Sequence, residues 1–218
     1  MFNKKISSET AKILIETKCV DISLKKKFVL TSGKKSPIYC DCRRLISFPV
    51  QRKSIINFAV KKINNESICK NLQNIAGGES AGIPFASFIS QKINLPLSYI
   101  RKEKKKFGKN SQIEGIIKPF ENVLLVEDLM TDGGSKIKFI ESILDVKANI
   151  KAIFVVFNYG INLEYIEVKK KKIKVIHLAT WQDVLQEYSY LKKISKKDKI
   201  DIEEFLKSVG VKNLKSSI

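Results

Sequence analysis

The stretch that decides the fold is Val123-Leu-Leu-Val-Glu-Asp-Leu-Met-Thr-Asp-Gly-Gly-Ser135. Its first four residues form a continuous apolar run, which is typical of a strand buried on both faces of a parallel sheet. Two acids follow, and a Gly-Gly turn then leads into residues 135–147, whose spacing predicts a helix. Because ligands of open α/β sheets sit at the carboxyl ends of strands, this junction is the first candidate site.

The chemistry of this junction suits a phosphorylated sugar. Backbone N–H groups in a Gly-rich loop form an anion cradle, and the N-terminus of the next helix adds its positive dipole end. Thr131 and Ser135 would add hydroxyl donors, while Glu127 and Asp128 would accept hydrogen bonds from sugar hydroxyls. The segment matches neither the Walker pattern nor Gly-x-Gly-x-x-Gly. Taken alone, it also fits an ordinary strand-to-helix turn with an acidic N-cap.

The remaining chain alternates between strand and helix patterns. Strands are expected at 74–76, 97–100, 123–126, 152–157 and 175–178. Helices are expected at 8–20, 51–63, 80–92, 135–147, 161–171, 181–191 and 201–208. This alternation predicts an α/β fold with a mostly parallel sheet flanked by helices.

The first 50 residues do not follow that rhythm: after the helix expected at 8–20 come two short strands, at 28–31 and 38–42. We therefore expect a single domain over residues 1–218. Its core would span about residues 51–180. A small hood would combine about residues 1–50 with the C-terminal segment.

The net charge of +19 permits a nucleic-acid, membrane or phosphorylated partner. The lysines, however, lie in separate runs at 25–27, 104–106, 169–172, 192–193 and 196–197. We expect solvated surface charge and no nucleic-acid or membrane partner. No apolar run reaches the ~18 residues of a membrane span, and the N-terminus lacks the apolar core of a secretory signal. These features predict a cytoplasmic protein.

The cysteines do not form a metal pattern. Cys19, Cys40, Cys42 and Cys69 include no Cys-x-x-Cys pair, and His177 is the one histidine of the chain. A zinc site needs about four well-spaced Cys or His ligands. We expect reduced thiols, no protein metal site and no catalytic role for His177.

Two further segments carry possible chemistry. The basic stretch Arg101–Lys109 follows an expected strand and lies in a long polar segment, which favours a cationic lid that closes over an anion. A solvated charge run is the alternative. The segment Gly77–Pro84 holds three glycines at a strand end, where they would allow close backbone approach to a ligand.

Together these motifs resemble the type I phosphoribosyltransferases. Their signature for phosphoribosyl pyrophosphate (PRPP) is an apolar strand, two acids, two apolar residues and Thr, then a Gly-containing phosphate loop, as in Val123–Ser135. Within that superfamily the chain is similar to the orotate phosphoribosyltransferase family. Further blocks match in the family's order, at Ser32–Tyr39, Gly77–Pro84, Arg101–Gly108 and Gln112–Gly115.

The resemblance implies the type I phosphoribosyltransferase fold and a site for PRPP and orotate. The implied PRPP-binding residues are Arg101, Lys102, Lys105, Glu127, Asp128, Leu129, Met130, Thr131, Asp132, Gly133, Gly134 and Ser135. Of these, Lys102 would be catalytic. Orotate would contact Thr131, Tyr39 and Tyr159. Mg²⁺ would be held through PRPP, pyrophosphate and water, without dedicated protein ligands.

The implied reaction joins orotate to PRPP and gives orotidine 5′-monophosphate and pyrophosphate, in a homodimer with shared sites. Departures from the family pattern at Thr31, Ala81, Phe107 and Tyr159 leave open how the orotate carboxylate is held. Candidates to hold it are Lys34, Lys35 and Arg43. Two other functions stay open: a phosphoribosyltransferase acting on a purine or uracil, and a non-enzymatic RNA-binding regulator on the same fold.

Overall fold

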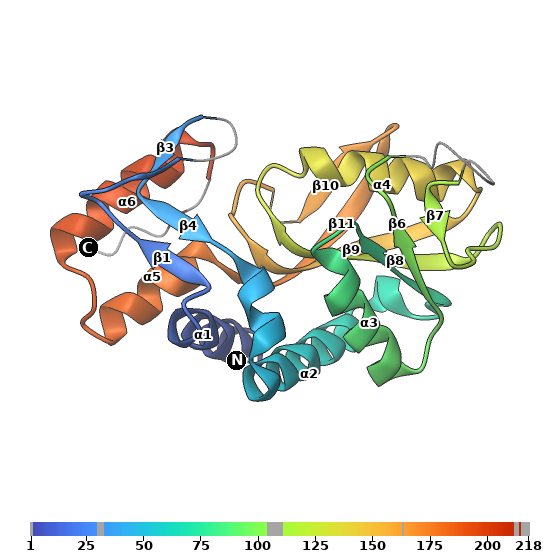
Figure 1. Cartoon of the computed structure of the whole chain (residues 1–218), viewed down its shortest axis with the longest axis horizontal. Coiled ribbons are helices and arrows are strands. Elements are labelled where there is room, and N and C mark those ends of the chain that lie inside the picture. Colours follow the sequence, from blue (N-terminus) through green and yellow to red (C-terminus); the bar gives the residue numbers. More distant parts are fainter. Residues whose placement is uncertain (1, 30–32, 104–110, 163, 212–213, 215–218) are drawn as a thin grey trace.

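The computed structural model describes residues 2–29, 33–103, 111–162, 164–211 and 214. Figure 1 shows two lobes side by side, a larger one around a sheet and a smaller one that contains both ends of the chain. The larger lobe holds a seven-stranded sheet in the order β10-β11-β9-β8-β5-β6-β7.

Five neighbouring strands of that sheet run parallel: β11 (Lys171–Thr180), β9 (Asn149–Asn158), β8 (Asn122–Met130), β5 (Asn74–Gly78) and β6 (Leu97–Ile100). The edge strands β10 (Tyr165–Val168) and β7 (Ile113–Glu114) are antiparallel to their neighbours. The predicted mostly parallel α/β sheet is confirmed. One boundary differs, because β8 continues through the two acids to Met130 rather than ending at Val126.

Helices cover both faces of the sheet. Helices α2 (Pro49–Asn65) and α3 (Gly82–Ile93) bury apolar side chains against one face, together with alternate β8 residues Leu124 and Val126. Helix α4 (Gly134–Asp145) packs on the other face, against Val123 and Leu125. Successive side chains of β8 therefore point to opposite layers, as the period of a strand requires.

The smaller lobe, which we call the hood, combines both ends of the chain (Figure 1). From the N-terminal part come α1 (Phe2–Glu16), β1 (Val20–Ile22), β2 (Phe28–Val29), β3 (Lys35–Ser36), β4 (Ile38–Cys40) and the 3₁₀ helix η1 (Cys42–Ser47). From the C-terminal part come α5 (Trp181–Tyr190) and α6 (Lys196–Ser208). A second 3₁₀ helix, η2 (Ser67–Cys69), connects α2 to β5.

The helix predicted at 161–171 is wrong. Within that range the chain forms β10, which pairs with β11 through a two-residue turn at Lys169 and Lys170. Both turn residues have positive φ, 48° and 63°, the backbone shape of a tight hairpin. Ile166 and Val168 alternate inward with exposed neighbours, so the period is that of a strand.

Two helix starts also differ from expectation. Helix α1 begins at Phe2 rather than near residue 8. Helix α6 begins at Lys196 rather than 201, because the Ser195 hydroxyl accepts a hydrogen bond from the Asp198 backbone N–H and caps it there.

Candidate active site at the carboxyl edge of the sheet

The carboxyl ends of the parallel strands bring most of the predicted site residues together. Arg101 and Lys102, which we call the lid base, follow β6 directly. Residues Glu127–Met130 form the end of β8, and residues 131–135, the phosphate loop, lead into α4. Lys105, together with Thr31 and Phe107, lies outside the described residues.

Glu127 is buried at the end of β8 and is held from the α4 side. Its Oε2 atom accepts a hydrogen bond from the Lys136 ammonium at 2.6 Å, and both side chains are almost fully covered. Its Oε1 atom is buried without a hydrogen-bond partner among the described residues. Burial raises the pKa of Glu127 to about 7 although Lys136 opposes the shift. The carboxyl is thus poised to change charge near neutral pH.

Two glycines from the Gly77–Pro84 segment make room for this carboxylate. A Cβ at Gly78 would lie 1.9 Å from Glu127 Oε1, and one at Gly82 would lie 2.8 Å from the same atom. Any side chain at either position would collide with the acid or displace it. The segment was predicted to let a ligand approach; in the structure these glycines let Glu127 approach.

Asp128 points to the opposite layer, toward the hood. It is 6% exposed, and its charge interacts with Arg43, Cys40 and Cys42 at the junction of β4 and η1. Burial raises the pKa of Asp128 above its ordinary value, while Lys136 and backbone N–H groups act in the opposite direction. Arg43 is itself paired with Asp41 at 2.6 Å.

The phosphate loop is shaped by Gly133 and braced by a neighbouring connection. Gly133 has φ +91°, a left-handed conformation that favours glycine, and it directly precedes α4. Asp132 Oδ1 accepts a hydrogen bond from the Gly134 backbone N–H at 3.0 Å, and the Asn162 amide donates to the Asp132 carbonyl at 2.7 Å. Thr131 and Asp132 are exposed, so the loop presents polar groups at the start of a helix.

The lid base is anchored at its backbone while the Lys102 side chain stays exposed. The Lys102 N–H donates to Glu79 Oε2 at 2.7 Å, which ties the start of the lid to the residue after β5. The Gln112 side-chain amide donates to the Arg101 carbonyl at 2.8 Å. The Arg101 guanidinium Nη1 lies 3.8 Å from Glu114 Oε1. Both ends of the lid segment therefore meet at the sheet edge.

Two tyrosines predicted to contact orotate lie on the hood side. Tyr39 is in β4, half-buried, with its ring centroid 5.6 Å from that of Phe28. Tyr159 follows β9 and packs edge-on against Phe157 and Trp181. Burial raises the pKa of the Tyr159 hydroxyl, and the charges of Cys40, Cys42 and Tyr39 act in the same direction.

The sequence did not single out three residues that shape the site. Lys136 pairs with Glu127, Glu79 holds the lid base, and Asn162 braces the phosphate loop. Of these, only Lys136 could have been inferred from the sequence. A lysine in the first turn of a helix is unfavourable next to the helix dipole, which suggests a nearby acid. Asn162 and Glu79 form backbone contacts that residue type alone does not reveal.

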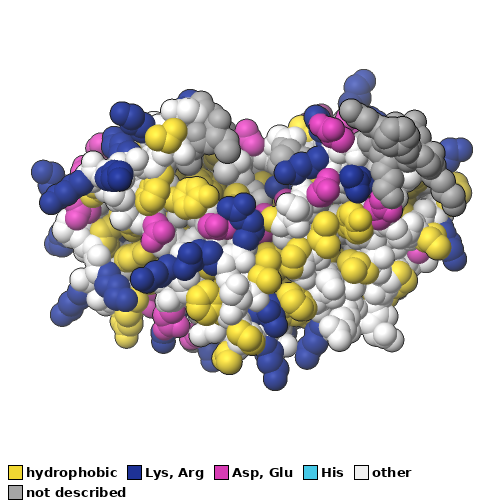
Figure 2. All heavy atoms as spheres, in the orientation of Figure 1, with side chains coloured by type: hydrophobic (Ala, Val, Ile, Leu, Met, Phe, Trp, Pro, Cys, Tyr) yellow, Lys and Arg dark blue, Asp and Glu magenta, His cyan; other side chains and the backbone are white. Residues whose placement is uncertain are grey.

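On the face shown in Figure 2, the charged side chains are spread rather than gathered. Figure 2 shows Lys and Arg side chains over both lobes of the visible face, with Asp and Glu side chains between them. Among the described residues, no group of three His, Cys, Asp or Glu side chains lies close enough to hold a metal ion. The helices that the structure describes include none that is both long and apolar enough to cross a bilayer.

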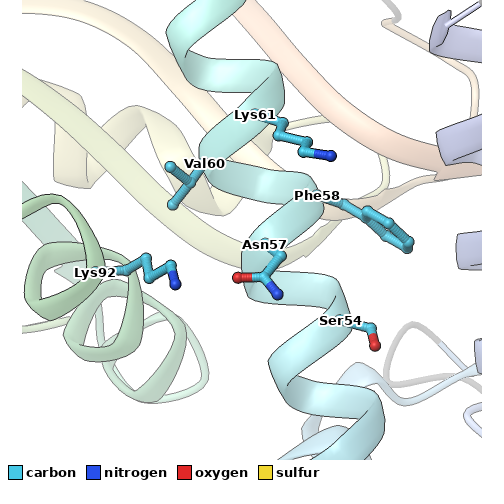
Figure 3. Close-up of a pocket in the computed structure, with 6 residues that line it drawn as sticks. All are labelled: Ser54, Asn57, Phe58, Val60, Lys61 and Lys92. Atoms are coloured by element: carbon cyan, nitrogen blue, oxygen red, sulfur yellow. The ribbon is translucent and has the colours of Figure 1, made fainter.

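A separate hollow of about 420 Å³ lies between α2 and α3. Figure 3 shows the side chains that line it: Ser54, Asn57, Phe58, Val60 and Lys61 from α2, and Lys92 from α3. None of these residues belongs to the predicted site. The candidate active site is therefore the carboxyl edge of the sheet, where the predicted residues converge, and not this hollow.

Comparisons with known proteins agree with this architecture. Residues 50–193 match the family model described as "Phosphoribosyl transferase domain". The chain is 44% identical over 179 residues to orotate phosphoribosyltransferase of Dinoroseobacter shibae, covering 82% of this chain and 79% of the relative. It is 39% identical to that of Jannaschia sp., covering 95% and 92% of the two chains.

Solved structures extend the comparison. Orotate phosphoribosyltransferase from Aeropyrum pernix superposes with a TM-score of 0.67 at 25% identity, covering 83% of this chain and 98% of that one. UMP synthase of Leishmania donovani superposes with a TM-score of 0.74 at 26% identity, over 92% of this chain but 42% of that longer protein. By sequence and by fold, the chain belongs to the orotate phosphoribosyltransferase family.

Proposed function

We propose that the protein transfers the 5-phosphoribosyl group of PRPP to orotate, producing orotidine 5′-monophosphate and pyrophosphate for pyrimidine biosynthesis. The carrying observation is the convergence of the acid pair, the phosphate loop and the lid base at one sheet edge. Relatives named for the orotate reaction over most of their length support the choice of base.

The charges of the residues at this edge suit different parts of PRPP. The backbone N–H groups of the phosphate loop and the start of α4 would bind the 5′-phosphate. Glu127 and Asp128 would accept hydrogen bonds from the ribose hydroxyls. Lys102, with Arg101 and Lys105, would stabilise the negative charge of the departing pyrophosphate. Closure of the lid would exclude water, which otherwise hydrolyses PRPP.

The donors at this edge fit a Mg²⁺ ion that is held by the substrate. Glu127 is engaged by Lys136, and the described residues form no carboxylate cluster. Mg²⁺ keeps several waters and prefers phosphate oxygens, so the diphosphate of PRPP and water would hold it. Bound there, it would neutralise charge on the leaving group.

For orotate itself, Thr131, Tyr39 and Tyr159 are the proposed contacts. The Tyr159 backbone N–H donates to the carbonyl of Met130 at 2.8 Å, which places Tyr159 beside the exposed Thr131, while Tyr39 lies in β4 of the hood. Of the three cations considered for the orotate carboxylate, Arg43 lies in η1, and its charge acts on Asp128 of the acid pair. We propose Arg43 for that role, in a homodimer whose lids serve the partner's sites.

The test follows pyrophosphate release from PRPP and Mg²⁺ with orotate, uracil, adenine or guanine in turn. Release with orotate alone is the expected result. Release only with another base would reassign the substrate, whereas tight RNA binding without any release would favour a regulator.

Two variants test the PRPP site itself. Asp128→Asn and Gly133→Val should abolish PRPP binding in a folded protein. Near-normal PRPP affinity in folded Gly133→Val would contradict the assignment of the phosphate loop.

A further inference from the structure

The feature that the proposed reaction leaves unexplained is Lys136, a buried ammonium in the first turn of α4. It is 7% exposed, and its position faces the positive end of the helix dipole. Burial of an ammonium and an unfavourable dipole both cost free energy. An aliphatic residue would fill the same space without that cost, so the charge itself needs a reason.

The structure supplies one reason in the geometry around Glu127. Lys136 Nζ lies 2.6 Å from Glu127 Oε2, while Gly78 and Gly82 close in on Oε1. The carboxylate is therefore fixed between α4 and the turn after β5. Its Oε1 has no donor among the described residues, and a buried acceptor left without a donor is destabilising. A sugar hydroxyl or a water brought with the ligand would satisfy it.

We propose that Lys136 is a positioning residue for PRPP: its ammonium keeps Glu127 an oriented carboxylate that can accept from the ribose hydroxyls. Lys136 acts through Glu127 and is distinct from the lid lysines that meet the pyrophosphate. This inference rests on the proposed function, because PRPP is the ligand that needs the charged acid.

The electrostatic surroundings of Glu127 predict how the pairing can be measured. The charged groups that act on Glu127 are Lys136 from α4, Asp128 from its own strand and Lys102 from the lid base. Lys136 and Lys102 favour the carboxylate, whereas burial and Asp128 favour the acid, and the pKa stands at about 7. Removal of the nearest cation should raise this pKa by roughly one to three units.

The experiment measures PRPP affinity by titration calorimetry from pH 6 to 9 for wild type, Lys136→Met and Lys136→Arg. Lys138→Met is the matched control, since Lys138 lies on the same helix with an exposed side chain. The phosphates of PRPP also titrate in this range, but equally for every variant. Thermal unfolding confirms that each variant is folded, and Lys136→Gln replaces Lys136→Met if that variant does not fold.

For Lys136→Met, the midpoint of the affinity–pH curve should move up by at least about one unit. A shift of about one unit should lower affinity at pH 7 about five-fold and restore most of it at pH 9, and a larger shift should lower it further at pH 7 while affinity still rises steeply toward pH 9. Lys136→Arg and Lys138→Met should keep the wild-type midpoint. In a Glu127→Gln background, Lys136→Met should cause no further shift of the midpoint.

An equal loss of affinity at all pH values, or no loss, would overturn the proposal and leave Lys136 with a packing role. Suppose that the wild type binds PRPP and releases pyrophosphate, and that Lys136→Met shows the same affinity–pH curve. This result would contradict the inference about Lys136 and leave the proposed function standing. Wild type that binds no PRPP at any pH would defeat the proposed function and this inference with it.

Discussion

At the scale of single residues, the acid pair shows how one strand can serve two layers. Glu127 and Asp128 are neighbours in β8, and side chains alternate along a strand. Glu127 therefore accepts a hydrogen bond from Lys136 of α4, while Asp128 lies on the hood side, where the charge of Arg43 acts on it. The two adjacent carboxylates therefore face different layers of the molecule at the proposed ribose site.

His177 gives a prediction that separates stability from activity. Burial and the nearby Lys62 lower its pKa to about 4, so the folded protein keeps the ring neutral while the unfolded chain protonates near pH 6.5. This contribution to stability is present above pH 6.5 and is lost as pH falls through 4. Between pH 7 and pH 5, wild type should lose about 1–2 kcal/mol more unfolding free energy than His177→Gln.

Urea unfolding at the two pH values measures this difference, and pyrophosphate release at pH 7.5 should be unchanged by the substitution. Parallel losses of stability in both proteins would contradict the expected neutral ring. A large loss of activity in folded His177→Gln would contradict the prediction that the histidine is not catalytic.

At the scale of elements, local patterns predicted the parallel strands but not every boundary. The apolar run Val123–Val126 identified β8. The strand continues for four more residues, to Met130, but the two acids interrupt the apolar pattern, so the pattern did not predict this extension. The hairpin with its turn at Lys169 and Lys170 was not predicted, because lysine is not a usual residue of tight turns. Tertiary pairing with β11 determined the outcome there.

The site was predictable to the extent that it is local. The phosphate loop and the acid pair are contiguous in the sequence, so their motif was readable. The Lys136–Glu127 pair spans a strand end, a loop and a helix start, and the contact of Asn162 with Asp132 spans 30 residues. Such contacts depend on how elements pack, which no single-sequence pattern encodes.

The brace from the β9–β10 connection to the phosphate loop can be tested with a matched pair of amides. The Asn162 amide donates to the Asp132 carbonyl at 2.7 Å. The Asn149 amide donates to the Phe120 carbonyl at 2.8 Å, at the opposite end of β9. Each bond contributes about 0.5–1.5 kcal/mol, so both alanine variants should lose similar stability.

PRPP binding should distinguish the two variants. Asn162→Ala should raise the dissociation constant for PRPP about 2- to 10-fold, because the loop loses its anchor. Asn149→Ala should leave it unchanged. Equal PRPP affinities in the two variants, measured by calorimetry at the same pH and Mg²⁺ concentration, would show that the brace does not reach the ligand.

At the scale of the whole molecule, the proposed site draws on distant parts of the chain. Tyr39 and Arg43 come from the hood, and Thr131 and Tyr159 come from the sheet, about 90 to 120 residues later in sequence. The lid segment begins at Lys102 and returns at Gln112, both at the same sheet edge.

Lid exchange in the proposed homodimer is testable by mixing two inactive proteins. Lys102→Ala disables the lid, and Asp128→Asn disables the ribose site, so each homodimer should be inactive. If each lid serves the partner's site, a mixed dimer has one site with both functions intact and one with both lost. Random exchange makes about half the dimers mixed, so roughly a quarter of wild-type activity should return. Pyrophosphate release is measured before and after exchange, with mixed dimers verified by two different affinity tags. A mixture that contains mixed dimers and stays inactive would show that each lid serves its own subunit.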